Sequence, residues 1–276
     1  MDFACHSQEY AMLGVMRRWK EGETPSYGLP IIETREDLKK QVVPDFFKAG
    51  FMPKLIEDYH RIKENLKGRL EVCIRKSVQG PFQTSTGLHG QENVFMDMLT
   101  DIDFVQELME FAFLFHKEYV RGWEKLHARD YVRFNIGDDD IDTRSTISPP
   151  TFRNMMMPMY KRYSERFNVI HWHSCGNTDD VFQDIASIPG LEILEIGPYD
   201  DTIAAARIFK GNGVKFYKCP NVPLVVNTTD KDAQIRFCEE MLQAGELVPP
   251  KTLFEAEDID HGLNLPKVFR EVSGKS

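Results

Sequence analysis

VIHWHSCGNTDD, residues 169–180, begins like a buried strand and ends like a loop that opens a helix. Residues two apart on a strand share one face, so His171, His173 and Cys175 are expected to point to the same side. The Gly-Asn pair that follows supplies the turn chemistry typical of a strand end. This stretch therefore predicts a strand whose carboxyl end carries potential metal ligands.

The same pattern, a short apolar strand that ends in polar residues, recurs along the chain. The strand candidates are residues 69–82, 131–140, 169–176, 191–197, 214–221 and 252–262. Amphipathic helical stretches such as 101–126 and 230–245 separate them, which predicts a parallel sheet with right-handed crossovers. The polar groups GDDD, HSCGN, EIGPYD, KCPN and DIDHG all sit at strand carboxyl ends. Because a (β/α)8 barrel builds its active site there, we predict an α/β fold of the TIM-barrel type.

One domain over residues 1–276 is the simplest organisation, because no repeat, low-complexity tract or linker interrupts the chain. Residues 1–68 are expected to be an irregular and helical N-terminal segment, with helices broken around Pro44 and Pro53. Residues 69–276 carry the strand–helix alternation. We expect the first barrel strand to be incomplete, so that the N-terminal part of the fold is shortened.

Composition limits the classes of function. The formal charge of −9 argues against nucleic acid and anionic membranes as partners. No apolar run approaches the roughly 18 residues of a membrane span, and the N-terminus does not resemble a signal peptide. Five cysteines without CxxC pairs are typical of a reduced, cytoplasmic protein. No GxGxxG or P-loop motif follows a strand, so nucleotide binding has no support.

The imidazole and thiol groups of His173 and Cys175 form a zinc-type donor set. Catalytic zinc takes three protein ligands and keeps one position open, so a third ligand is expected from another strand end. The candidates are Cys219 and His261, with Glu255 and Glu257 as substitutes. The alternative is a polar layer of the barrel that holds no metal.

The segment NIGDDDIDTRS, residues 135–145, is strongly acidic and covers the end of the predicted strand 131–140. At a barrel mouth, Asp138 and Asp139 are suited to proton transfer or to binding a cationic or metal-bound group. A solvated acidic loop is the alternative. Candidates for substrate binding at the same strand ends are Gln79, Phe82, Arg144 and Tyr199.

Several motifs together resemble the uroporphyrinogen decarboxylase superfamily, which includes zinc-dependent, corrinoid-linked methyltransferases such as methylcobamide:coenzyme M methyltransferase. The motifs are QGPFQTSTGLHG (79–90), GDDDIDTRSTISPPTFRNMMMPMYKR (137–162), HWHSCGNTDD (171–180), KCPNVPLVVNTTDKDA (218–233) and DIDHGLNLPKVFREV (258–272). The resemblance covers nearly all of the chain in order and implies a single barrel.

The methyltransferase branch carries an H-x-C pair that His173 and Cys175 match, and a distant cysteine whose place is taken here by His261. The resemblance therefore implies zinc on these three residues. It also implies methyl transfer between a small-molecule donor or acceptor and a corrinoid or thiol, with Asp138 and Asp139 handling substrate or protons. A partner protein would supply the corrinoid (cobalamin). Whether the chain also forms a homodimer is left open.

Two alternatives remain open. The first is a uroporphyrinogen-type decarboxylase without a metal, in which Asp2 would match the catalytic aspartate of that branch. The arginine-rich N-terminal motif of the decarboxylases is missing, although several buried carboxylates of a porphyrinogen would need such cations. The second is a binding paralogue that has lost catalysis.

Overall fold

The computed structural model describes residues 8–13, 29–70, 72, 77–127, 134–211, 213–226, 228–245, 251–252 and 259–274. The chain divides into two compact units, Met1–Phe134 and Asn135–Ser276. The single domain over residues 1–276 stays a prediction. No helix in the described ranges is both long enough and apolar enough to cross a membrane.

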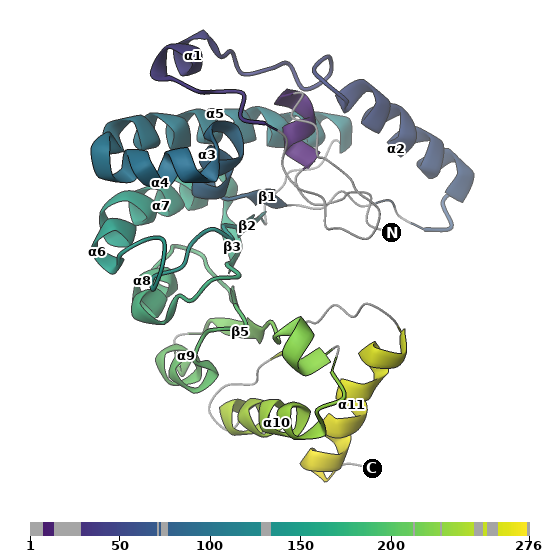
Figure 1. Cartoon of the computed structure of the whole chain (residues 1–276). Helices are drawn as coiled ribbons and strands as arrows, with labels where there is room; N and C mark the ends of the chain where they lie inside the picture. Colours follow the sequence, from purple (N-terminus) through teal and green to yellow (C-terminus); the bar gives the residue numbers. More distant parts are fainter. Residues whose placement is uncertain are drawn as a thin grey trace. The chain divides into compact units, whose positions relative to one another are not determined.

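The first unit is mainly helical. Its elements are η1 (Gln8–Leu13), α1 (Arg35–Lys40), α2 (Met52–Leu66), β1 (Ser77–Gln79), α3 (Pro81–His89), α4 (Gln91–Thr100) and α5 (Ile102–His127). Thr34 and Asp37 close a capping box at the start of α1, and Pro53 opens α2 instead of breaking it. The helices α3, α4 and α5 pack together, and every residue of α3 is buried (Figure 1).

The predicted strand 69–82 is too long in its last part. Gly80 is the N-cap of α3, and Pro81 is the first residue of that helix. Proline has a fixed φ and no N–H to donate, which favours the first turn of a helix over a strand interior. The predicted helix 101–126 is confirmed by α5.

The second unit alternates strands and helices. In chain order its elements are β2 (Phe134–Gly137), α6 (Pro149–Thr151), η2 (Phe152–Met156), α7 (Met157–Phe167), β3 (Val169–His173), η3 (Asp179–Val181), α8 (Phe182–Ala186), β4 (Ile193–Ile196), α9 (Thr202–Phe209), β5 (Lys215–Lys218), η4 (Val222–Val226), α10 (Lys231–Gly245), β6 (Lys251–Thr252) and α11 (Ile259–Ser273).

These strands lie side by side in the order β2-β3-β4-β5-β6. The pairs β3–β4, β4–β5 and β5–β6 are parallel, and His173 lies opposite Glu195 in the register. Parallel neighbours place all strand carboxyl ends at one edge, as the sequence predicts. Among the described strand pairs the sheet is an open run and does not close into a ring.

The predicted strand 252–262 is wrong at its carboxyl end, because α11 begins at Ile259. His261 therefore lies in the first turn of a helix and not on a strand tip. Leu265, Val268 and Val272 recur at helical spacing and join the apolar cluster shared with α10. Burial of this face favours the helix over an alternating strand. Figure 1 shows α10 and α11 packed side by side.

Candidate metal centre

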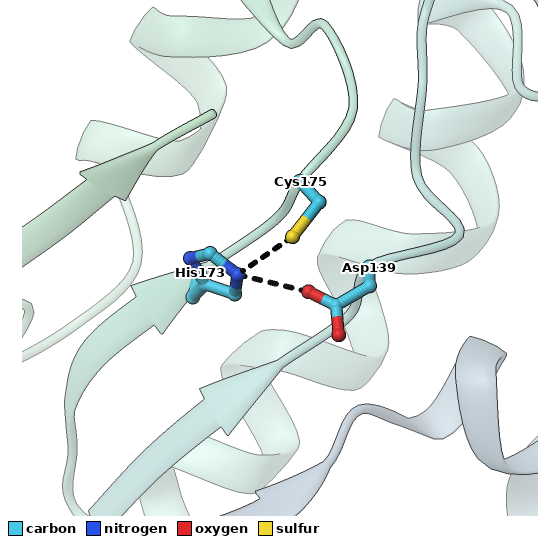
Figure 2. A group of neighbouring side chains, drawn as sticks. All are labelled: Asp139, His173 and Cys175. Carbon is cyan, nitrogen blue, oxygen red and sulfur yellow. Dashed lines mark hydrogen bonds and ion pairs between the residues drawn. The ribbon is translucent and has the colours of Figure 1, made fainter. Parts of the chain in front are cut away.

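Three predicted site residues meet at the ends of β2 and β3. Asp139, His173 and Cys175 each offer one ligand atom, and these atoms all lie within 4.8 Å of one another. His173 Nε2 is 2.9 Å from Asp139 Oδ1 and 3.3 Å from Cys175 Sγ, so the imidazole lies between the two (Figure 2). In the described part of the chain, no other group of three or more such residues was found.

Local packing fixes this arrangement. Trp172 is fully buried while its strand neighbours His171 and His173 are only partly so, which agrees with the predicted alternation of faces. The turn that carries Cys175 then presses against the loop after β2. A Cβ on Gly176 would lie 2.2 Å from the carbonyl oxygen of Ile141, so only glycine allows this approach.

The ligand spacing is close to that of a zinc site. Tetrahedral zinc has bonds of about 2.0–2.1 Å to nitrogen and about 2.3 Å to sulfur, which separates these ligand atoms by about 3.5 Å. A carboxylate oxygen would lie about 3.3 Å from the nitrogen. The observed 3.3 and 2.9 Å differ from these values by a few tenths of an ångström. The two pairs that include His173 Nε2 therefore have nearly the spacing of zinc ligands, and all three ligand atoms lie within 4.8 Å of one another.

In the metal-free site, the His173 imidazole and the Cys175 thiol hold protons at the positions where a metal would bind. Burial alone would lower the pKa of His173, but hydrogen bonds with Asp139 and Cys175 and the charge of Glu195 raise it well above its ordinary value. Burial raises the pKa of the Cys175 thiol, and the His173 hydrogen bond opposes that change. A metal that binds here must displace both protons, because its ligands are imidazole and thiolate.

Glu195 on β4 is a site residue that the sequence analysis missed. Its Oε1 is 3.5 Å from His173 Nδ1, and its Oε2 is 3.0 Å from His171 Nε2. The Cys219 thiol donates to Glu195 Oε1 over 3.6 Å. Burial would raise the pKa of Glu195, yet its histidine neighbours lower it. A carboxylate behind a metal-binding histidine orients the ring and raises its basicity. The only sequence signal was an acid inside the apolar strand LEILEIG.

The two predicted catalytic aspartates have different environments. Asp139 joins the triad, whereas Asp138 is fully buried and its carboxylate accepts a hydrogen bond from Tyr160 at 2.8 Å. The Asp138 N–H donates to the His173 carbonyl at 2.8 Å, which ties the loop after β2 to the end of β3. Asp138 thus supports the loop in this structure, and its catalytic role stays a prediction.

The remaining predicted residues are not part of the triad. Arg144 is exposed and pairs with Asp179, 2.8 Å away, and Tyr199 is 62% exposed. In the first unit, Phe82 is buried against Phe95, and the Gln79 N–H donates to Glu9. Their substrate-binding roles stay predictions.

Three further candidates for the site are placed as follows. Cys219 follows β5 and contacts Glu195, and it is not a member of the triad. Asp2 and the side chains of His261, Glu255 and Glu257 lie outside the described residues. The role of His261 as third ligand therefore stays a prediction, beside Asp139, which the structure brings to the same place.

Comparisons with known proteins agree with this fold. The model of the family described as uroporphyrinogen decarboxylase (URO-D) matches residues 3–226 of the chain. A solved structure, a methyltransferase from Methanosarcina mazei, is similar with a TM-score of 0.71 at 18% identity, covering 99% of this chain and 80% of that chain. No curated protein sequence matches significantly. The predicted superfamily is confirmed, as is the fold class, an α/β fold of the TIM-barrel type.

Proposed function

The chain belongs to the uroporphyrinogen decarboxylase family, and from this premise we propose that it is a zinc-dependent methyltransferase. It would move a methyl group between a small molecule and a corrinoid or thiol acceptor. The observation that carries the proposal is the triad of Asp139, His173 and Cys175 at the carboxyl ends of two parallel strands. The methyltransferase name of the structural neighbour supports this branch of the family.

In this proposal Asp139, His173 and Cys175 hold the zinc, and the fourth position stays open for a substrate atom. Bound zinc supplies Lewis acidity and keeps a coordinated thiol as thiolate at neutral pH. Asp139 and the Cys175 thiolate together carry two negative charges, which would balance the two positive charges of the zinc ion. Glu195 lies behind the His173 ring, 3.5 Å from Nδ1, and its charge would raise the basicity of the ring toward a metal on Nε2.

The charge around the site favours particular substrates. Asp140 and Asp142 follow Asp139 in the same loop, and Arg144, the nearest cation in sequence, is paired with Asp179. A substrate with many carboxylates would meet like charge there, which costs several kcal/mol when the groups are desolvated. A neutral or cationic methylated compound, or the cobalt of a methylated corrinoid on a partner protein, meets no such barrier.

Elemental analysis of protein purified without chelator or histidine tag tests the metal. We expect close to one zinc per chain, with most of it lost in Cys175→Ser and retained in Cys238→Ser, whose thiol is buried against α11. Cobalamin absorbance with a panel of methyl donors then tests the reaction. Full zinc content in Cys175→Ser would refute the site, and methyl transfer by metal-free protein would refute the mechanism.

Asp139 and His261 compete for the place of the third ligand. Asp139→Asn keeps the shape of the side chain and removes its charge, so it should weaken zinc binding if Asp139 is the ligand. His261→Gln should then have little effect. The opposite result would assign the third position to His261 and leave Asp139 to bind substrate.

The description of the matching family favours a second candidate, porphyrinogen decarboxylation. The same protein preparation can be assayed with uroporphyrinogen and the products separated by chromatography. Robust formation of coproporphyrinogen by metal-free protein would support decarboxylation and overturn the methyltransferase proposal.

A further inference from the structure

A buried acid and a buried lysine lie among the loops that surround the triad, and neither belongs to it. Asp200 follows β4 and is 5% exposed, and Lys218 ends β5 and is 3% exposed. Charged side chains are seldom buried this far unless hydrogen bonds satisfy them, because desolvation of the charge is costly. Their hydrogen bonds show which segments of the chain they connect.

Asp200 binds the segment that carries Cys175. Its Oδ1 accepts the Thr178 N–H at 2.5 Å and the Thr178 hydroxyl at 3.2 Å. Its Oδ2 accepts the Gly197 N–H at 2.7 Å. One carboxylate therefore joins the turn after β3 to the turn after β4.

Lys218 holds Asp200 in place from the next strand. Its Nζ donates to the carbonyl oxygens of Gly197 at 2.8 Å and of Asp200 at 2.7 Å. The contact between the two turns is also tight, because a Cβ on Gly197 would lie 2.8 Å from the carbonyl oxygen of Cys175. The hydrogen bonds thus run from β5 through the loop after β4 to the Cys175 segment.

We infer that Asp200, held by Lys218, is a positioning residue that fixes the Cys175 segment and so presents the thiol to the metal. The inference has two parts. That the thiol is presented to a metal rests on the proposed zinc function. That Asp200 fixes residues 174–178, called the clamp below, rests on the hydrogen bonds alone. Asp200 does not touch the ligand atoms and acts through Thr178 and the turn between them. Without its carboxylate, Thr178 loses both of its hydrogen bonds to the loop after β4, and the bond from Asn177 to the Tyr199 carbonyl remains.

Asp200→Asn tests the inference, since asparagine has the same shape but only one acceptor oxygen and no charge. Asp201→Asn is the matched control, because Asp201 is an exposed helix cap and asparagine caps helices equally well. In full-length, metal-free protein titrated with zinc, Asp200→Asn should bind about 10-fold to 100-fold more weakly, as for other groups behind metal ligands. Asp201→Asn should stay within about twofold of wild type.

Two readouts separate positioning from general stability. With cobalt in place of zinc, Asp200→Asn should show a weaker thiolate-to-cobalt absorption band at saturation. In the metal-free protein, amide hydrogen exchange over residues 174–178 should rise at least about tenfold in Asp200→Asn alone. Wild-type zinc affinity in a folded Asp200→Asn protein would overturn the inference.

If Asp200→Asn does not fold, Thr178→Val takes its place, because it removes only the hydroxyl donor. Zinc binding should then weaken about threefold, and an unchanged affinity would overturn the inference. If the wild-type protein binds no zinc, the proposed function fails. Hydrogen exchange then decides the clamp separately: unchanged protection in Asp200→Asn overturns it, and a local rise at residues 174–178 supports it.

Discussion

Asp200 makes the stability of the protein depend on pH in a direction opposite to that of most acids. Burial raises its pKa from 3.8 to about 6, although hydrogen bonds from Thr178 and Gly197 and the charge of Lys218 oppose the rise. Asp179 is the other charged group that acts on it, and it adds to the rise. Between these two pKa values the folded state holds a proton that the unfolded state has released, so stability falls as pH rises.

The magnitude follows from the shift. One pKa unit corresponds to about 1.4 kcal/mol, so a shift from 3.8 to about 6 gives about 3 kcal/mol over the whole transition. This stability is fully present below pH 3.8 and is lost by about pH 6. Between about pH 4.5 and about pH 7.5, where the fold is easier to study, about 2 kcal/mol of it should be lost.

Urea unfolding of metal-free wild type and Asp200→Asn at several pH values measures the effect. The free energy of unfolding of wild type relative to Asp200→Asn should fall by about 2 kcal/mol from about pH 4.5 to about pH 7.5. Taking the difference removes the titration of all other groups, and Asp201→Asn serves as the control. A difference that is constant with pH would show that Asp200 is solvated in the folded protein, and the argument for a buried carboxylate would fail.

Three other predictions concern the triad and its support. Glu195→Gln should weaken zinc binding about 10-fold to 100-fold, while Glu192→Gln, at an exposed position, should not. Equal zinc affinities of Glu195→Gln and wild type would show that Glu195 does not support the metal site. Zinc affinity should rise with pH by up to about 100-fold per pH unit, because binding displaces protons from the His173 imidazole and the Cys175 thiol, whose pKa values are both raised. A potentiometric titration that finds no proton release on zinc binding would contradict this. Gly176→Ala should lower the free energy of unfolding by about 1–3 kcal/mol or more, because its Cβ would lie 2.2 Å from the Ile141 oxygen. Gly137→Ala, whose nearest contact would be at 3.8 Å, should lower it less, and thermal unfolding compares the two variants.

The sequence alone determined what lies within each element. Alternation along residues 169–173 placed His171 and His173 on one face, because the side-chain period of a strand is two, whereas Cys175 lies in the turn after β3. The repeated order of strand, polar tip and helix predicted a parallel α/β fold, and the described strand pairs confirm it. These features are local, and the chain encodes them in its spacing of apolar residues.

Only the tertiary structure decided which residues from different elements meet. The sequence offered three consecutive aspartates, and packing turned Asp138 to Tyr160 and left Asp139 facing His173. The register of β3 against β4 brought Glu195 opposite His173, which no periodicity within one strand can specify. Residues 259–273 became a helix because their apolar face packs on α10, so His261 lies on no strand tip. Contacts between elements depend on packing and register, and these are set by the whole fold rather than by any single stretch of sequence.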